Sequence, residues 1–397
     1  MKIYIIGIGM DGQKTLTAEA LAAIESADVI IGAKRMVELF SRLEKKSFIS
    51  WKTEEIREFI HDNSFSSVAV LMSGDCGFYS GAEKLISVLC CYETEVISGI
   101  SSPTYFCAKI KKPWQNMKFI SLHGTDGNIV RNVCKNECCF FLLGGDVTPV
   151  EICRKLCGYG RGNIGVYIGE NLGYDSEKIM FGKASDFTEK SFGKLAVMVT
   201  ENHRYENRIA FGIPDNEFIR GSIPMTKSEV RSAVISKLDI GSKSICWDIG
   251  CGSGSVSVEM ALQGFDGKVF AIDKNSEAVE LTRKNAIKFG CDNIEIISGE
   301  APESLRELPS PDIVFIGGSC GKISEILSII YGKNKTAIVV ITAVSLETLS
   351  TAQKAFGDFG ITEPEITELS VTRTKRLGNH TMLAAENPVF IIKGARF

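Results

Sequence analysis

Short apolar runs alternate with helical patterns from one end of the chain to the other. Near the start, KIYIIGIG (2–9) is apolar and ends in glycines. The next stretch, TLTAEALAAIESA (15–27), has the spacing of an amphipathic helix, with Thr17 as its N-cap. Strands separated by helices favour a largely parallel sheet with helices on its faces. Six further apolar runs continue this order at 28–33, 67–75, 93–102, 139–146, 163–173 and 194–202.

A polar stretch interrupts the alternation near the middle of the chain. Residues 201–221 (ENHRYENRIAFGIPDNEFIRG) contain many charged residues, glycines and Pro214, which is typical of a linker. A chain of 397 residues is also longer than an ordinary domain with a single hydrophobic core. We therefore expect two α/β domains, residues 1–203 and 204–397.

The second half starts a new set of strands and helices. Two late apolar stretches, 363–374 and 387–394, have no clear helix between them, so we expect an antiparallel pair at the sheet edge. The five strands before them are expected at 243–250, 268–273, 294–301, 312–318 and 336–344.

The stretch DIGCGSGSVSVEMA (248–261) crowds three glycines into five positions directly after the first of these strands. Glycine permits positive φ and lets a ligand approach the backbone, and strand–glycine turn–helix units bind nucleotides at the carboxyl ends of strands. Asp273 ends the next strand, about twenty residues on, where a carboxylate accepts hydrogen bonds from both ribose hydroxyls.

The sequence of the turn indicates which nucleotide it binds. It reads Asp-x-Gly-x-Gly-x-Gly, and a carboxylate at Asp248 would repel the pyrophosphate of a dinucleotide. S-adenosylmethionine (SAM) has no phosphate and carries an ammonium and a sulfonium. We therefore expect SAM here, with Gly299 at the adenine edge; a structural turn without a ligand is the alternative. The predicted SAM contacts are Asp248, Gly250, Cys251, Gly252, Ser253, Gly254, Asp273, Glu300 and Ala301.

The segment before this domain, GSIPMTKSEVRSAVISKL (221–238), leads into a helix. It resembles the segment that covers the cofactor in methyltransferases of this kind, so Thr226 and Lys227 are candidates to reach the cofactor or an acidic substrate. A second interpretation is structural: Thr226 caps the helix, and Glu229 completes a capping box. The two interpretations are compatible.

Small-residue turns also follow strands in the first half, at IIGIGMDG (5–12), SGDCGFYSG (73–81) and SGISSPTYF (98–106). No acid ends the second strand to bind a ribose, so the residues alone leave a ligand site and a structural turn equally open. The candidate cofactor contacts are Gly7, Gly9, Asp75, Phe78, Ser101 and Ser102.

These motifs carry a family resemblance over nearly the whole chain. The three turns above, with MKFISLHG (117–124) and GENLGYDSEKI (169–179), resemble the tetrapyrrole methylase family. The second half, from FIRGSIPMTKSEVR (218–231) to NPVFII (387–392), resembles the decarboxylating precorrin methyltransferases. Joined in this order, the two halves resemble the fused precorrin-6Y C5,15-methyltransferase family of cobalamin synthesis.

The resemblance implies a fold and an activity. It implies a two-lobed methylase fold that binds SAM between its lobes, followed by a Rossmann-like SAM domain. It also implies methylation of precorrin-6Y, or of its cobalt form, at carbon-5 by the first domain. Methylation at carbon-15 and decarboxylation of the ring C acetate would belong to the second. The chain departs from the family turn Ser-Gly-Asp-Pro, because Cys76 replaces the proline that would fix φ.

A substrate with many carboxylates calls for local cations, because the net charge of the chain is -3. Arg376, His380 and Lys227 are the candidate catalytic residues, with His380 as a possible proton donor for decarboxylation. Methyl transfer itself needs positioning and exclusion of water more than a strong base. Each cation is alternatively a solvated surface charge. The candidate substrate contacts are Lys34, Arg35, His123, Arg220, Arg231 and Arg373.

Amino-acid composition and net charge bear on the binding partners, the redox compartment and the presence of a metal site. The net charge and the lack of interleaved basic and aromatic residues argue against nucleic acid or membrane partners. Thirteen cysteines without a secretion signal favour a reducing cytoplasm and buried thiols. CKNECC (134–139) and CRKLC (153–157) match no zinc spacing, so no metal is expected. By analogy with methylases of both kinds, we expect a homo-oligomer. The rival hypotheses are an RNA or protein methyltransferase and a non-catalytic SAM-binding scaffold.

Overall fold

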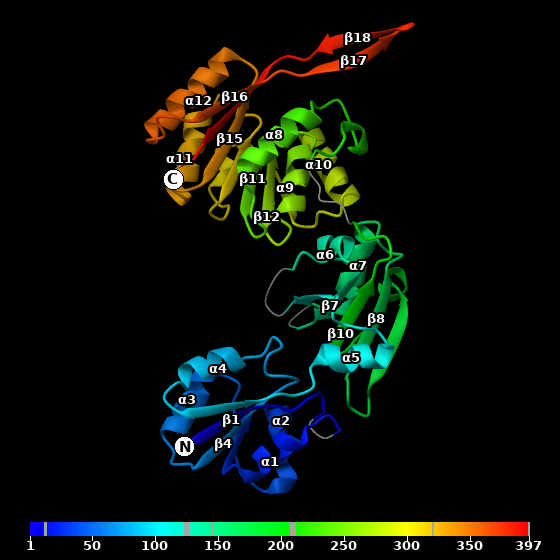
Figure 1. The fold of residues 1–397 in the computed structure, drawn as a ribbon, viewed down its shortest axis with the longest axis vertical. Coiled ribbons are helices and arrows are strands. Elements are labelled where there is room, and N and C mark those ends of the chain that lie inside the picture. The colour runs from blue at the N-terminus through cyan, green and yellow to red at the C-terminus, as the bar shows by residue number, and fades with distance from the viewer. Residues whose placement is uncertain (12–13, 123–126, 145–146, 207–211, 320, 396–397) are drawn as a thin grey trace. The chain divides into compact units, whose positions relative to one another are not determined.

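The computed structural model describes residues 1–11, 14–122, 127–144, 147–206, 212–319 and 321–395 (Figure 1). The chain separates into two compact units. The first consists of Met1–Gly127, Asn136–Arg154 and Gly162–His203. The second consists of Asn128–Lys135, Lys155–Arg161 and Arg204–Phe397. Across the described ranges, each helix is too short or too polar to cross a lipid bilayer.

The first unit opens with a five-stranded parallel sheet of order β3-β2-β4-β1-β5. Helix α1 begins where its N-cap was predicted, because the Thr17 side chain accepts a hydrogen bond from the Ala20 N–H. The strands are β1 (Lys2–Gly7), β2 (Val29–Gly32), β3 (Lys46–Ile49), β4 (Ser67–Met72) and β5 (Glu93–Ile97). The helices are α1 (Ala18–Ser26), α2 (Lys34–Glu38), η1 (Ser41–Leu43), α3 (Thr53–His61), α4 (Ala82–Val88) and α5 (Ser102–Ile110).

A second five-stranded sheet follows, of order β6-β7-β10-β8-β9. Here the expectation of one largely parallel sheet is wrong, because only β6 and β7 are parallel and the other three pairings are antiparallel. Two sheets agree with the two lobes that the family resemblance implies. The strands are β6 (Lys118–Ser121), β7 (Cys138–Leu142), β8 (Gly165–Glu170), β9 (Lys178–Lys183) and β10 (Ala196–Glu201). The helices of this stretch are α6 (Ile129–Lys135), which belongs to the second unit, α7 (Pro149–Gly158), which begins in the first unit and ends in the second, and η2 (Ala184–Phe187) of the first unit.

The second unit is built on a seven-stranded sheet of order β13-β12-β11-β14-β15-β19-β16. Its first five strands are parallel, as predicted. The predicted antiparallel pair is also present, with β19 inserted between β15 and β16 at the sheet edge. The strands are β11 (Ile245–Ile249), β12 (Lys268–Asp273), β13 (Ile294–Ser298), β14 (Ile313–Ile316), β15 (Ile338–Ala343), β16 (Glu365–Leu369) and β19 (Val389–Gly394). The helices are η3 (Asp215–Glu217), α8 (Ser228–Leu238), α9 (Ser255–Gln263), α10 (Ser276–Lys288), η4 (Glu303–Leu305), α11 (Ile323–Lys333) and α12 (Leu346–Asp358).

Two apolar cores cover the faces of this sheet. Along β11, Trp247 and Ile249 pack with α11 and α12, whereas Cys246 packs with α8 and α9. This alternation is the period of two that a strand imposes on its side chains. Ile213 and Phe218, which lie in the expected linker, are buried in the second of these cores. That part of the linker is therefore packed structure of the second unit.

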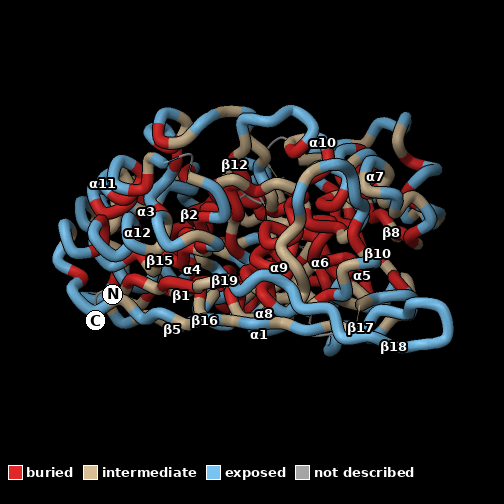
Figure 2. The backbone as a smooth tube through the Cα atoms, turned by 90° about the horizontal axis from the view of Figure 1, so that it is seen from above, coloured by how far each residue is buried: buried red, intermediate tan, exposed pale blue. Residues whose placement is uncertain are grey.

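One element was not predicted from the sequence. β17 (Thr372–Leu377) and β18 (His380–Ala385) form a separate two-stranded hairpin, and nearly all of its residues are exposed. Figure 1 shows it extending away from the seven-stranded sheet, and Figure 2 shows it exposed along its length. Its apolar positions do not pack against a core, so the sequence carried little of the pattern that identifies strands.

The cysteines are mostly buried, as expected. Every described cysteine is a free thiol. Cys134, Cys139 and Cys153 of the two cysteine-rich motifs are buried. Burial raises the pKa of Cys76 and of Cys246 to about 12, so these thiols stay protonated at neutral pH.

Candidate functional site

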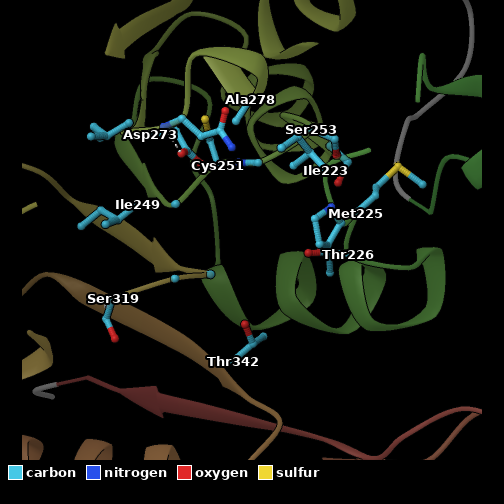
Figure 3. Close-up of a pocket in the computed structure, with 18 of the residues that line it drawn as sticks. Ile223, Met225, Thr226, Ile249, Cys251, Ser253, Asp273, Ala278, Ser319 and Thr342 are labelled. Atoms are coloured by element: carbon cyan, nitrogen blue, oxygen red, sulfur yellow. Dashed lines mark hydrogen bonds between the residues drawn. The ribbon is translucent and has the colours of Figure 1, made fainter. Parts of the chain in front are cut away.

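A cavity of about 550 Å³ lies at the carboxyl edge of the parallel strands of the second unit (Figure 3). The register pairs Ile249 of β11 with Ile272 of β12 and with Ile316 of β14, so the residues that follow these strands leave the sheet at one edge. The wall opposite is formed by residues 223–227, which precede α8. Switch points of this kind are where open α/β sheets bind ligands.

The glycine turn after β11 is held tightly against its neighbours. Gly250 has φ +74°, and a Cβ added there would lie 2.8 Å from the backbone nitrogen of Gly318. The N–H groups of Gly250 and Cys251 donate to the Ile272 carbonyl at 2.9 and 3.1 Å. Gly254 has φ +72° and is the N-cap of α9. The conformation of this turn therefore requires glycine at several positions.

Asp273 lines the cavity with its carboxylate fixed by two backbone donors. Oδ2 accepts the Gly252 N–H at 2.9 Å, and Oδ1 accepts the Asn275 N–H at 2.9 Å. Each oxygen keeps lone-pair capacity for a further donor. The predicted position for binding two hydroxyl groups is therefore built from β12 and the glycine turn together.

Two further candidate SAM contacts, Glu300 and Ala301, also line the cavity. The Glu300 carboxylate lies 3.5 Å from the Lys274 ammonium and 3.6 Å from the Lys322 ammonium. These two charges hold the pKa of Glu300 below its usual range. Glu300 is therefore ionised at neutral pH at the rim of the cavity.

Asp248 does not line the cavity, contrary to the expectation of direct ligand contact. The alternation of β11 turns its side chain to the face that α9 covers, where it is fully buried and accepts a hydrogen bond from the Ser257 hydroxyl. Burial raises the pKa of Asp248 to about 7, the Asp273 charge adds to the rise, and the Ser257 hydrogen bond opposes it. Asp248 is therefore close to half protonated at neutral pH.

The Asp248→Asn variant is expected to lose a pH dependence of stability. The folded pKa is raised above the ordinary 3.8, so the folded state binds the extra proton and is stabilised at low pH. That stabilisation is lost as pH rises toward 7, by about 2.5 kcal/mol between pH 5 and 8. Urea unfolding followed by fluorescence of buried Trp247 should show this slope in the parent chain and not in the variant. The exposed Glu280→Gln change on α10 is the control and should leave the slope intact.

Thr226 and Lys227 both line the cavity, as the cofactor interpretation predicted. The capping-box interpretation is wrong, because α8 begins at Ser228 with Lys227 as its N-cap and without a side-chain cap. Glu229 instead binds Arg373 and the Ser228 hydroxyl. Figure 3 shows Thr226 and Met225 in the wall that faces the cavity.

Most of the predicted cations lie away from this cavity. Arg231 is fully buried and pairs with Glu259 and Asp215, so its assignment as a substrate contact is wrong. Arg373 is paired with Asp215 and Glu229 and is not among the lining residues. The structure likewise does not bring three exposed residues to the cavity: Arg220, Arg376 and His380.

Another cavity, of about 560 Å³, lies within the first unit; it is called the first cavity below, and the cavity of the second unit is called the second cavity. Three of the candidate cofactor contacts, Asp75, Phe78 and Ser102, line it. Arg35 also lines it, and its guanidinium donates to the Tyr174 hydroxyl and, at 3.4 Å, to Ser73 Oγ. The expected substrate cation Arg35 is therefore present at this cavity.

The turns around this cavity are joined through glycine backbone. A Cβ on Gly7 would lie 2.7 Å from the nitrogen of Gly99, and Gly9 pairs with Gly74. The Asp75 carboxylate accepts the N–H of Gly99 at 3.0 Å and the N–H of Gly77 at 2.8 Å. Gly7 and Gly9 are thus not lining residues but shape the turn that carries Asp75.

The remaining predictions in the first unit have mixed outcomes. Ser101 is the N-cap of α5 and accepts the Thr104 N–H, which is a structural role. Lys34 is not among the lining residues and lies 3.8 Å from Glu38 on the same helix. Cys76, which replaces the family proline, is buried with its sulfur 3.5 Å from the Ile5 and Ile97 carbonyls. His123 lies outside the described residues.

Sequence reasoning missed several lining residues. Gly317, Gly318 and Ser319 follow β14, and Thr342 is the penultimate residue of β15. Their signal was their place at the carboxyl ends of β14, which neighbours β11, and of β15, the next strand in the same parallel sheet. In the first unit the missed residues include Met10, Tyr174 and Lys194, which come from separate loops and have no shared local pattern.

In the comparisons with known proteins, the sequence models of two families match different parts of the chain. The sequence model of the family described as "Tetrapyrrole (Corrin/Porphyrin) Methylases" matches residues 2–188, and that of the "Precorrin methyltransferase domain" matches residues 217–396. A crystal structure described as precorrin-6Y C5,15-methyltransferase from Geobacter metallireducens is 37% identical, with a TM-score of 0.45, over 47% of this chain and 97% of that one.

Two curated relatives share the name "Probable cobalt-precorrin-6B C(15)-methyltransferase (decarboxylating)". The protein of Pyrobaculum calidifontis is 43% identical over 184 residues, 46% of this chain and 94% of the relative. That of Saccharolobus solfataricus is 44% identical over 195 residues, 48% of this chain and 98% of the relative. Because nearly the full length of both relatives is matched at this identity, the chain belongs to the precorrin methyltransferase family.

Proposed function

We propose that this chain methylates precorrin-6Y, or its cobalt form, at carbon-5 and at carbon-15, and decarboxylates the acetate on ring C. SAM is the proposed methyl donor at both positions. The observation that carries this proposal is the presence of two cavities. One lies wholly within the region matched by the precorrin methyltransferase model, and the other is lined mainly by residues of the region matched by the tetrapyrrole methylase model, together with residues 194–197 beyond it.

The proposal divides the work between two domains, residues 1–203 and 204–397. The first would methylate carbon-5, because its region matches the tetrapyrrole methylases. The second would methylate carbon-15 and remove carbon dioxide, because its region matches the precorrin methyltransferase domain and relatives of that length carry the corresponding name.

The residues of the second cavity fit SAM. Its volume of about 550 Å³ lies within the range of small-molecule sites. Asp273 presents a fixed carboxylate suited to two ribose hydroxyls, and the bare backbone of Gly250 and Gly252 allows close approach. Asp273 and Glu300 place two carboxylates in the lining that attract a cation, and Lys227 and Lys274 in the same lining balance their charge overall.

When bound, SAM supplies an electrophilic methyl group, and the chain's task is to position the acceptor carbon and exclude water. Ile223, Met225 and Ile272 give the cavity apolar walls. Val344 lines the same cavity and is 75% exposed, which provides an apolar surface at its mouth for a flat macrocycle. Lys227 is placed in the wall to hold a substrate carboxylate.

The first cavity offers a comparable set of groups. Asp75 and Ser102 are placed to bond a polar ligand, and Phe78 adds an apolar surface. The Arg35 guanidinium, held by Tyr174, provides a positive charge for the carboxylates of a tetrapyrrole.

The direct test is a mass measurement. The full chain is incubated with SAM and precorrin-6Y, and the product is expected to carry two added methyl groups and to have lost carbon dioxide. Running the reaction with and without cobalt in the ring identifies the substrate form. Tight SAM binding with no change in product mass would favour a non-catalytic scaffold, and methylation of RNA or protein instead would overturn the proposal.

A further inference from the structure

Residues 212–227, called the wall segment here, form one side of the second cavity with almost no regular structure of their own. Their single regular element is the short helix η3. The cavity itself is lined by residues 223–227 of this segment. A Cβ on Gly252 would lie 3.3 Å from the Pro224 carbonyl oxygen, so the segment packs directly on the glycine turn. Backbone groups without a helix or strand need other partners to hold one conformation.

Two fully buried charged side chains supply those partners. The Glu259 carboxylate of α9 accepts the N–H of Gly212 at 2.8 Å and that of Ile213 at 3.1 Å. The Arg231 guanidinium of α8 donates to Glu259 at 2.5 Å, to the Thr226 carbonyl at 2.5 Å and to the Ile213 carbonyl. A single planar group therefore holds both ends of the wall segment.

The middle of the wall segment is fixed by an amide. The Asn285 side chain of α10 accepts the Ile219 N–H at 2.8 Å and donates to the Ile219 carbonyl at 3.1 Å. The same amide donates to the Ser253 carbonyl in the glycine turn at 2.9 Å. The Phe218 ring lies 4.7 Å from the Arg231 guanidinium carbon, which adds a cation–π contact.

We propose that Arg231 is a positioning residue for the cofactor site. It does not line the cavity, and it acts by holding the wall segment against the glycine turn, so that residues 223–227 are in place before a ligand arrives. This inference rests on the proposed function, since SAM is the ligand whose affinity it sets. Lysine cannot replace arginine here, because one ammonium cannot reach acceptors arranged around a planar fork.

The network continues to the base of the hairpin. The Asp215 carboxylate of the wall segment lies 3.4 Å from Arg231 and 3.4 Å from Arg373 of β17. Arg373 also pairs with Glu229 of α8, and the pKa of Glu229 is held below its usual range by this hydrogen bond. Asp215 is therefore a second position at which the network can be weakened: its side chain is 13% exposed, and Arg231 keeps its pairing with Glu259 when Asp215 is replaced.

The test uses the full chain carrying Arg231→Lys. Amide hydrogen exchange is measured without any ligand. Exchange is expected to become at least about tenfold faster, and only in residues 212–227, because the variant loses roughly one charged hydrogen bond. The KM for SAM in carbon-15 methylation should rise by a similar factor, whereas kcat should change much less. Arg283→Lys, at an exposed position of α10, is the matched control and should change neither quantity.

Two outcomes would overturn the inference. One is unchanged exchange in the wall segment of Arg231→Lys. The other is equal loss of protection in strands β11 to β15, which would make Arg231 a residue of general stability. If Arg231→Lys does not fold, Asp215→Asn decides, with a smaller change expected in the same segment and no change overturning the inference. A parent chain that binds no SAM would overturn the proposed function, while the exchange pattern would still decide the role of Arg231.

Discussion

Gly250→Ala is expected to abolish methylation at carbon-15 while leaving methylation at carbon-5 intact. Alanine at φ +74° costs about 1–2 kcal/mol relative to glycine. Its Cβ would also lie 2.8–3.0 Å from the backbone of Gly318, which lines the same cavity, so the ends of β11 and β14 must move apart. Together these effects should weaken SAM binding at the second unit at least about a hundredfold.

Calorimetric titration of the full chain with SAM checks this expectation directly. The parent is expected to bind two molecules and the Gly250→Ala chain one. Gly357→Ala is the control, because Gly357 lies in α12 with open space around its added Cβ. Retention of both binding events in Gly250→Ala would contradict the role given to the glycine turn.

Gly99→Ala should produce the opposite pattern, with carbon-5 methylation lost and carbon-15 methylation kept. The added Cβ would lie 2.5 Å from the Gly7 carbonyl oxygen and would also meet the Gly74 carbonyl. Both are backbone atoms, so no side-chain rotation can relieve the clash. The displacement would break the hydrogen bond from the Gly99 N–H to Asp75 and disturb the turn that lines the first cavity.

The measurement is single-turnover methylation with product mass analysis, in which one methyl group and the loss of carbon dioxide should remain. Gly81→Ala, with negative φ and open space around its Cβ, serves as control and should behave as the parent chain does. Loss of both methylations in Gly99→Ala would mean that the two sites do not work independently and would contradict the division of labour proposed above.

Local pattern predicted the second unit well. Five parallel strands and the glycine turn were read from short apolar runs and their spacing, because buried parallel strands are continuous apolar sequences. The direction of strands in the sheet formed by β6 to β10 was missed. Direction depends on which strand a segment meets in space, and nothing within KLAVMVTEN (194–202) records that it pairs antiparallel with β7 and β8.

Site residues whose place is fixed by the course of the backbone were predicted from the sequence. Residues whose role depends on where a long side chain ends were missed. Asp273 and the glycines follow from the course of the chain. Arg231 was grouped with surface cations by its charge alone, although Val234, Ile235 and Leu238 recur at helical spacing after it and mark the same buried face of α8. An arginine on an apolar stripe is therefore a signal of an internal ion pair that the sequence did contain.

The buried acid beneath the glycine turn gives the second cavity an adjustable charge. Because Asp273 lines the cavity and its charge already raises the pKa of Asp248, a cation in the same place must lower that pKa. A cation such as the proposed sulfonium would therefore shift Asp248 toward its ionised form. The charge at this buried position is therefore not fixed by the fold but responds to what occupies the cavity.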